Sequence, residues 1–384
     1  MRKILFVRDH VRVGGTTSSL AAVYEYLKDK ADVDFFVASY EGEDVVFKNR
    51  LLKKDFLLDA YFGQFSSRGI VTKCIMIPLK LIRHSPAKVR CKFEDSLYKK
   101  AVKRIESNKK YDFVVGFMEG ISTQLASYFN CENKIAWIHC DYDRYLPKEI
   151  SEEPLYSRFK HIVTVAEYTS EVFRKRYPRL SSRVSTIYNI INYDSIKLKS
   201  LETIQDCRYD NGSFTIISVG RIDKVKRFSE IPSIAFMLKE KGTRFKWYIL
   251  GPIREDEEFD KLITNISSYN VSESVLYLGE KTNPYPFFAS ADLYVCLSYS
   301  EACPMVFNEA KIFNLPIVTT DFPSSFEFVR QDKDGMILPL NNIADGISKM
   351  IEDSSYYNKV KSCKSNIEKA SAVIFDQLDN LFQV

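Results

Sequence analysis

Glu301 and Glu309 stand eight positions apart in the segment SYSEACPMVFNEAKIFNLPIVTTD (298–321). Of all segments in this chain, this one has the residues best suited to bind a ligand or to catalyse a reaction. The pattern places Glu301 on a loop and Glu309 in a helix that begins near Pro304. Carboxylates are natural acceptors for paired hydroxyls, and the N–H groups at a helix start can hold hydroxyls or phosphate oxygens. The spacing alone means little, because charged helix residues are usually just exposed.

A basic loop directly follows the predicted strand FTIISVG (214–220). It contains four cations in seven residues, Arg221, Lys224, Lys226 and Arg227. An arginine can hold two phosphate oxygens through its planar guanidinium, and a lysine adds a mobile point charge. Ligands of open α/β sheets bind beyond the carboxyl ends of the strands. The loop therefore predicts a diphosphate site, with a solvated basic loop as the alternative.

Two weaker candidates lie in the first half of the chain. Gly14 and Gly15 begin the run GGTTSS between a strand and a helix, where the main chain could approach an anion, although a plain capped turn explains the run equally well. His139 ends the strand KIAWIH, where an imidazole can donate to a ligand or move a proton, but most histidines have no such role. The Asp-x-Asp that follows (141–143) lacks a third ligand beside it, so no metal site is predicted.

Twelve short apolar runs, each bounded by polar residues or glycine, predict strands that alternate with helices. Such near-continuous apolar strands indicate parallel sheets covered on both faces, an α/β architecture. The polar segment 193–213 has no clear period and predicts a linker between two doubly wound domains. The expected domains are residues 1–195 and 196–365, followed by an amphipathic C-terminal helix, 366–384, that must dock on one of them.

Length and composition agree with two globular domains: 384 residues, 45% of them apolar and 27% charged. The net charge of +5 conceals a basic stretch, residues 68–110, with 13 Lys and Arg against three acidic residues. Its mixed basic and apolar character suits an anionic membrane surface, and a solvated helix face plus a buried strand is an equal alternative. Only Phe93 and Tyr98 interrupt the cations as aromatics, so no nucleic-acid partner is predicted.

The sequence shows neither an apolar run long enough for a membrane-spanning helix nor a secretory signal. No run of 18 uncharged apolar residues exists, and the N-terminal MRKILFVRDH is too short and polar for a secretory signal. Eight cysteines are scattered without C-x-x-C. The expected location is the cytoplasm, and the basic stretch would add peripheral contact with the inner face of the plasma membrane.

Taken together and in order, these segments resemble the retaining glycosyltransferases of family 4, which have the GT-B fold. The resemblance is strongest over 214–340. There, Glu301 and Glu309 match the family's Glu-x7-Glu element, and Arg221 and Lys226 match its Gly-Arg-x4-Lys element, with Gly220 as the glycine. Gly14 and Gly15 match the family's N-terminal glycine loop, and four residues are similar to landmarks of its bacterial polysaccharide branch: Glu119, His139, Glu167 and Asn189.

The sequence departs from the family pattern in the two donor loops. Ala302 stands where the family usually has glycine. Arg227 replaces the usual glycine after Lys226, and Lys224 is near enough in sequence to be the phosphate ligand instead. These changes leave the choice between the two lysines open.

The resemblance implies two Rossmann-like domains facing across a cleft, with the acceptor in the N-terminal domain, a UDP- or GDP-sugar in the C-terminal domain, and the last helix crossing back to the N-terminal domain. It implies catalytic roles for His139, Arg221, Lys226 and Glu301, and acceptor or structural roles for Glu119 and Asn189. No metal or other cofactor is expected, because the leaving phosphate can act as base in a front-face attack. The implied donor contacts are Gly14, Gly15, Gly220, Arg221, Lys226, Glu301, Cys303, Pro304, Met305 and Glu309.

The expected function is retaining transfer of a hexose or N-acetylhexosamine to a lipid-linked glycan or a surface polysaccharide. A nucleotide-sugar epimerase of the same double-Rossmann architecture is one alternative, which the context of the Glu-x7-Glu element disfavours. A non-enzymatic two-domain ligand-binding protein of the periplasmic type is another, and it would predict an export signal.

Overall fold

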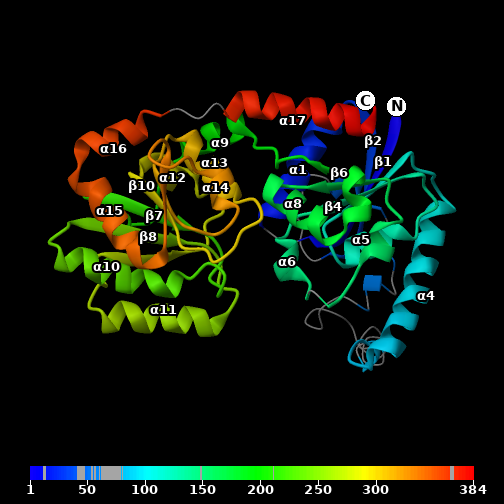
Figure 1. Cartoon of the computed structure of the whole chain (residues 1–384), viewed down its shortest axis with the longest axis horizontal. Coiled ribbons are helices and arrows are strands. Elements are labelled where there is room, and N and C mark those ends of the chain that lie inside the picture. Colours follow the sequence, from blue (N-terminus) through cyan, green and yellow to red (C-terminus); the bar gives the residue numbers. More distant parts are fainter. Residues whose placement is uncertain are drawn as a thin grey trace. The chain divides into compact units, whose positions relative to one another are not determined.

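The chain divides into two compact units. The computed structural model describes residues 1–11, 14–40, 48–52, 55, 58–59, 61, 79, 81–147, 149–210, 212–363 and 367–384. One unit is Met1–Ile190 together with Val373–Val384, and the other is Ile191–Ala372 (Figure 1). The sequence-based borders after residues 195 and 365 fall near these points without coinciding with them.

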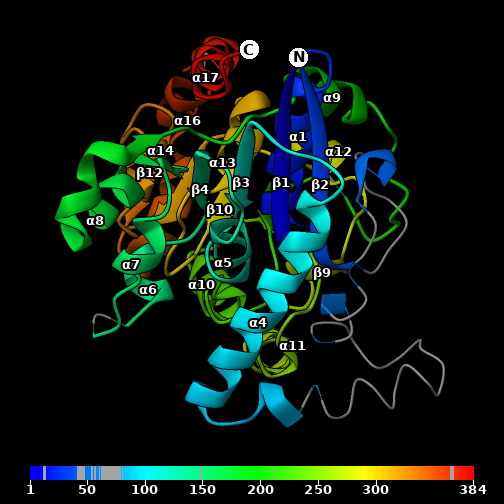
Figure 2. The same ribbon diagram turned by 90° about the vertical axis from the view of Figure 1, so that its right-hand side faces the viewer.

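The first unit is built on a six-stranded, wholly parallel sheet in the order β2-β1-β3-β4-β5-β6. Figure 2 shows β2, β1, β3 and β4 side by side. Residues 4–7 of β1 and 113–115 of β3 are almost wholly buried, as expected of strands with helices on both faces. The strands are β1 (Arg2–Val11), β2 (Ala31–Tyr40), β3 (Phe113–Phe117), β4 (Asn133–Ile138), β5 (His161–Thr164) and β6 (Val184–Thr186).

Helices follow the strands of this unit and cover the sheet. The longest described helix is α4, whose apolar residues Leu97, Tyr98, Ala101 and Val102 are buried in the core. The helices are α1 (Gly15–Leu27), the 3-10 turn η1 (Lys48–Arg50), α4 (Ala87–Glu106), α5 (Ile121–Ser127), α6 (Tyr142–Tyr145), α7 (Glu153–Tyr156), α8 (Glu167–Arg176) and η2 (Pro178–Arg183).

The last helix, α17 (Ile367–Phe382), completes the first unit with its C-terminal part. Phe382 is fully buried and its ring lies 5.5 Å from that of Phe113, edge to face. Phe375 stacks on Tyr26 of α1 at 4.2 Å. These aromatic contacts dock an amphipathic helix on the edge where β1 and β3 begin, beside α1 (Figure 1).

The second unit repeats the design with another six-stranded parallel sheet, in the order β12-β11-β10-β7-β8-β9. Its core includes Trp247, Ile249 and Val295, all fully buried. The strands are β7 (Phe214–Val219), β8 (Phe245–Leu250), β9 (Val275–Gly279), β10 (Leu293–Cys296), β11 (Ile317–Thr320) and β12 (Gly335–Leu338). All twelve strands of the two units lie within the runs that the apolar pattern predicted, or overlap them.

The helices of the second unit lie between these strands. Those after β7, β8 and β9 are η3 (Phe228–Glu230), α10 (Ile231–Glu240), α11 (Asp256–Ser268) and α12 (Tyr285–Ser290). Those after β10 are α13 (Met305–Ile312), α14 (Ser325–Phe328), η4 (Leu340–Asn342), α15 (Ile343–Glu352) and α16 (Ser354–Lys361).

The predicted linker, 193–213, differs from the structure in its first part. Residues Tyr193–Lys199 form helix α9, which Asn192 caps by accepting the Ser195 N–H at 3.0 Å. Ile196 is buried against Ile312. A single apolar side chain with a good cap is enough to fold this short helix onto a neighbour, and a periodicity search over a polar segment does not detect it.

The basic stretch 68–110 is described only in part, since residues 68–78 and 80 lie outside the described residues. Its helix is α4, which extends the predicted helix 93–106 at its N-terminal end. Within the described parts of the chain, no helix is long and apolar enough to cross a membrane.

Candidate functional site

An ion pair joins the two motifs of the second unit that the sequence separates by 75 positions. Strands β7 and β10 are neighbours in the sheet, so the loops after them leave the same edge. The Lys226 ammonium donates to Oε1 of Glu301, which also accepts the Ser298 hydroxyl at 2.7 Å. The Lys226 and Glu301 side chains are only 14% and 17% exposed. The structure therefore brings these two predicted residues together.

Electrostatics keep Lys226 charged in this place. Burial by itself would lower the pKa of the ammonium, but the facing Glu301 carboxylate outweighs it, so the pKa of Lys226 is raised. A charge pair taken out of water holds together strongly, and removing one partner leaves an uncompensated charge.

Arg221 takes a more open position than Lys226. Its Nη2 lies 3.3 Å from Oδ2 of Asp223, and its side chain is 54% exposed. Asp223 is buried and its Oδ1 accepts the Lys226 N–H at 3.0 Å. Asp223, which the sequence analysis did not single out, thus contacts the side chain of Arg221 and the main chain of Lys226, and the guanidinium of Arg221 stays accessible to an anion.

The two lysines of the loop have different partners. Lys224 is 63% exposed and its Nζ lies 3.8 Å from Oε2 of Glu257 in α11. Lys226 is paired with Glu301 instead. Of the two, Lys226 shares its surroundings with the second motif.

Hydrogen bonds fasten the loop after β10 on both sides. The Tyr299 N–H donates to the Val225 carbonyl at 2.8 Å, and the Ser324 hydroxyl donates to the Glu301 carbonyl at 2.6 Å. The Arg227 guanidinium lies over the Tyr299 ring, 4.4 Å from its centroid. A loop held in this way presents Glu301 in a fixed geometry, which precise ligand recognition requires.

Residues 302–304 lead from this loop into α13. Ala302 and Pro304 are buried, and Cys303 is partly exposed. Pro304 stands at the N-cap and Met305 is the first helical residue, with no side-chain cap at Pro304. The first main-chain N–H groups of α13 therefore remain for other acceptors.

Glu309 lies further along α13 and faces α12. Its Oε1 is 3.4 Å from the Tyr285 hydroxyl, a neighbour that the sequence analysis missed. Burial raises the pKa of Glu309 to about 7, and the Tyr285 hydroxyl offsets only part of that effect. This carboxyl group can therefore change charge near neutral pH. No sequence signal links Tyr285 to Glu309, because only the packing of α12 on α13 brings them together.

Two glycines allow the ends of β7 and β8 to touch. The Gly220 N–H donates to the Leu250 carbonyl at 2.9 Å. A Cβ on Gly251 would lie 1.8 Å from the Gly220 carbonyl oxygen, and Gly251 has a φ of +144°, which side chains rarely adopt. The sequence analysis singled out Gly220 and missed Gly251, although both form this close contact below the basic loop.

In the first unit, Glu119 and His139 lie together at the carboxyl ends of β3 and β4. Glu119 Oε2 accepts the main-chain N–H of His139 at 2.9 Å, and Glu119 is buried. The His139 ring packs 4.5 Å from that of Phe117. Burial, and next the positive charge of Arg8, lower the pKa of His139 to about 3, so its imidazole is neutral.

Three further predicted residues of the first unit lie at the start of α1 or contact it, while Glu167 begins α8. Gly14 is the N-cap of α1 and Gly15 its first residue. A Cβ on Gly14 would meet no atom within 4 Å. Asn189 Oδ1 accepts the hydroxyl of the buried Ser19 at 2.7 Å. Asn189 therefore anchors the first turns of α1.

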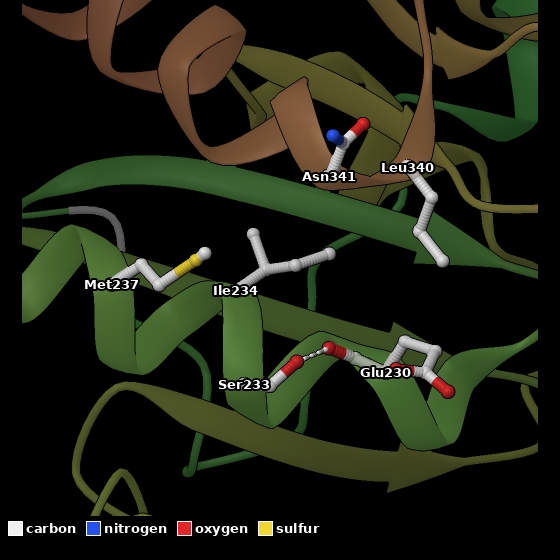
Figure 3. A pocket seen from close by; sticks show the side chains of 6 residues that line it. All are labelled: Glu230, Ser233, Ile234, Met237, Leu340 and Asn341. Atoms are coloured by element: carbon white, nitrogen blue, oxygen red, sulfur yellow. Dashed lines mark hydrogen bonds between the residues drawn. The ribbon is translucent and has the colours of Figure 1, made fainter.

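The described residues form no metal site, and a surface pocket lies away from the motifs. No three His, Cys, Asp or Glu side chains of the described parts come together as a metal site. A surface pocket of about 430 Å³ in the second unit contains none of the predicted residues (Figure 3). It is lined by Glu230, Ser233, Ile234, Met237, Leu340 and Asn341.

Comparison with known proteins matches residues 202–370 to the family of glycosyl transferases group 1. A Campylobacter jejuni protein, N-acetylgalactosamine-N,N'-diacetylbacillosaminyl-diphospho-undecaprenol 4-alpha-N-acetylgalactosaminyltransferase, is 31% identical over 196 residues. This alignment covers 50% of the chain and 50% of that relative, so the chain matches about half its length.

Solved structures match the whole chain at low identity. Anabaena HepE in complex with UDP and glucose has a TM-score of 0.69 at 14% identity, covering 99% of this chain and all of that one. A variant of S. aureus TarM, in complex with fondaparinux, alpha-GlcNAc-glycerol and UDP, has a TM-score of 0.71 at 14% identity, with 100% of both chains covered.

The two parallel-sheet units and these likenesses define a GT-B fold. Residues 202–370 match the family of glycosyl transferases group 1, which agrees over this part of the chain with the resemblance to family 4 that the sequence indicated.

Proposed function

We propose that the protein is a retaining glycosyltransferase that moves a hexose or N-acetylhexosamine from a nucleoside-diphosphate sugar to a lipid-linked glycan or a surface polysaccharide. The observation that carries the proposal is the pairing of Lys226 with Glu301, because it joins the two family elements at one edge of the second sheet. The two structural neighbours HepE and TarM are in complex with UDP and a sugar or glycoside, which supports a nucleotide sugar as donor.

In the proposed reaction the basic loop carries the leaving group. Arg221, exposed beside Asp223, would bind the diphosphate, and Lys226 would neutralise the charge that develops when the glycosidic oxygen leaves. Fixed charges aimed at such developing charge usually give the largest single contribution to catalysis. When Lys226 pairs with the phosphate, its ion pair with Glu301 would weaken, and Glu301 would accept hydrogen bonds from the sugar hydroxyls. Glu309 would accept hydrogen bonds from the ribose hydroxyls.

Retention follows, in this proposal, from attack on the face that the leaving phosphate occupies. The leaving phosphate takes the proton of the acceptor hydroxyl, so neither a protein nucleophile nor a metal ion is required. The neutral His139 would lie near the reacting face of the sugar and exchange hydrogen bonds with it rather than charge.

A lipid-linked acceptor is supported by the name of the Campylobacter relative, which contains diphospho-undecaprenol. The described part of the basic stretch adds a second argument. Leu81 and Val89 are 69% and 55% exposed, and the cations Lys92, Lys99 and Lys103 are exposed on α4. Such a mixture suits an anionic bilayer, where each cation near the lipid contributes about 1 kcal/mol. Flotation with anionic vesicles should recover the protein, and no binding at moderate salt would exclude this surface.

The donor is identified by a thermal-shift panel of uridine and guanosine diphosphate sugars, since a bound donor in large excess should stabilise the protein by about 3 kcal/mol. Transfer to a lipid-linked glycan is then followed with the donor found, and the anomeric proton of the product reports retention. An epimerised donor formed without acceptor would contradict transfer.

Arg221→Ala tests the site itself. It should lower transfer by about 100-fold with little loss of stability, since the side chain is exposed. Lys224→Ala, in the same loop but paired with Glu257, is the matched control and should stay close to wild type. Equal effects of the two variants, or wild-type transfer by Arg221→Ala, would show the site assignment to be wrong.

A further inference from the structure

Arg227, the last cation of the basic loop, has a main-chain conformation that favours glycine. Its φ is +53° and its ψ is +35°, in the left-handed region. Residues with a side chain rarely adopt this region, because the Cβ comes too close to the following carbonyl oxygen. Glycine, which the family pattern has at this position, adopts it freely. Local backbone preference therefore does not account for an arginine here.

Arg227 is also the cation of this loop whose charge no carboxylate matches. The other three cations each face one: Arg221 faces Asp223, Lys224 faces Glu257 and Lys226 faces Glu301. Within the described parts of the chain, the guanidinium of Arg227 makes neither a hydrogen bond nor an ion pair, and it lies over the Tyr299 ring. The surplus positive charge of the loop is therefore that of Arg227.

The Tyr299 ring supports this guanidinium without using its hydrogen-bond donors. The distance from the guanidinium carbon to the ring centroid is 4.4 Å. An arginine stacks on an aromatic face through its planar group, so its N–H groups can still donate to an anion. Tyr299 is 51% exposed and Arg227 is partly exposed. The stacked cation is thus held in place and accessible to a ligand.

Both residues lie on the two loops that leave the same edge of the second sheet. The Tyr299 N–H donates to the Val225 carbonyl at 2.8 Å, and Lys226 pairs with Glu301, so two contacts join these loops. Strands β7 and β10, which precede the loops, are neighbours. Arg227 directly follows Lys226 in the chain. Its guanidinium therefore belongs to the edge where a ligand of the second sheet is expected.

We propose that Arg227 is a third cation for the diphosphate of the donor, and that Tyr299 orients its guanidinium. A planar guanidinium can hold two phosphate oxygens side by side. Since carboxylates match the other three cations of the loop, Arg227 supplies the unmatched charge for an anionic ligand. This role rests on the proposed function, because it assigns a further contact to the donor of that reaction. The diphosphate of a lipid-linked acceptor has the same chemistry, and the place of Arg227 directly after Lys226 favours the donor.

Calorimetric titration with UDP and with GDP tests this contact without any acceptor. With the nucleotide that wild type binds more tightly, Arg227→Gly should lower the affinity about tenfold or more, because a charge-assisted hydrogen bond is lost. Its thermal stability should stay close to wild type, because glycine adopts the left-handed conformation. Arg227→Lys keeps the charge without the planar group and should lose less affinity. Lys224→Ala, an exposed cation of the same loop that faces Glu257, is the matched control and should bind like wild type.

Salt dependence separates a direct charge contact from a change in loop structure. The difference in affinity between wild type and Arg227→Gly should narrow as NaCl rises from about 0.05 M to about 0.5 M, because salt screens the attraction. Tyr299→Leu should lower the affinity about threefold in the wild-type background. It should have no further effect in Arg227→Gly, where the ring has no guanidinium to orient.

Three results would overturn the proposal: unchanged nucleotide affinity in Arg227→Gly, an equal loss in Lys224→Ala, or a loss that does not vary with salt. Unchanged nucleotide affinity together with a higher acceptor KM in Arg227→Gly would assign the cation to the acceptor instead. A loss of affinity in Arg221→Ala but not in Arg227→Gly would overturn this role and leave the proposed function in place. A wild-type protein that binds neither UDP nor GDP would overturn both.

Discussion

The two units place buried cations at the carboxyl edges of their sheets in different ways. In the second unit, Lys226 is matched by Glu301, and Ser298 and Asp223 hold the two loops in place. In the first unit, two N–H groups of Arg8 have no hydrogen-bond partner among the described residues, and the carboxylates whose charges act on it most are Asp9 and Glu119. A buried cation in contact with a carboxylate contributes to the stability of the folded state. A buried cation whose N–H groups lack hydrogen-bond partners contributes much less.

The difference concerns what each edge does. In the second unit an ion pair joins two loops that leave the same edge of the sheet. The first unit fixes one main-chain position, that of His139, through a neighbouring carboxylate. The edge of the second unit therefore joins two loops through side chains, and the edge of the first unit holds one main-chain group through a carboxylate.

Replacing each buried cation with methionine should give the largest contrast. Lys226→Met leaves Glu301 buried without its partner, so we expect a loss of about 3 kcal/mol of stability and of about 1,000-fold in transfer. Arg8→Met should cost clearly less stability, because its guanidinium is already partly unpaired. Urea unfolding and initial rates measure both effects.

The double variant Lys226→Met with Glu301→Gln is the control for this comparison. It should recover most of the stability, because no buried charge is left alone, without recovering transfer. Equal stability losses for the two single variants would mean that the two edges do not differ as described.

The main-chain contact between Gly251 and Gly220 offers a second test of the rigid edge in the second unit. Gly251→Ala should cost about 3 kcal/mol or more, because its Cβ would overlap the Gly220 carbonyl. Gly242→Ala is the matched control: φ is +78° and no atom lies within 4 Å of its Cβ, so only the backbone cost of about 1 kcal/mol applies. Similar unfolding free energies for the two variants would contradict a close contact at this edge.

Glu309→Gln should have a smaller effect than the variants above: it should raise the stability of the protein and lower its affinity for a nucleotide sugar. The folded protein takes up a proton on Glu309 between pH about 4.5 and about 7, so wild-type stability falls as pH rises through that window. At pH about 8 the variant should be more stable by about 2 kcal/mol. Its affinity for a nucleotide sugar should be about tenfold lower, because the carboxylate acceptor is lost.

The pH dependence of binding checks the same assignment. A nucleotide sugar has no group of its own that titrates between pH about 6 and about 8, so wild-type affinity should rise over this range and that of Glu309→Gln should not. A wild-type affinity that does not vary with pH would remove Glu309 from the donor contacts.

Much of the fold could be read from local patterns. The twelve strands follow from short apolar runs, since each buried parallel strand needs little besides apolar residues and a bounding turn. Helix α9 was missed, because its stability comes from Ile196 packing on another helix rather than from its own sequence. The basic loop and the glutamate loop could be recognised for a similar reason: each motif is contiguous, and Lys226 and Glu301 stand in loops that directly follow predicted strands.

The sequence by itself determined that two parallel α/β sheets form and that a basic loop and a glutamate loop each follow a strand of the second one. Only the tertiary structure decided that these two strands are neighbours, that Lys226 rather than Lys224 pairs with Glu301, that Tyr285 reaches Glu309, and that Glu119 accepts the His139 N–H. The physical reason is that local sequence fixes the conformation of an element and the burial of its faces. Contacts between elements depend on strand order, register and helix packing, which bring together residues that no local pattern connects.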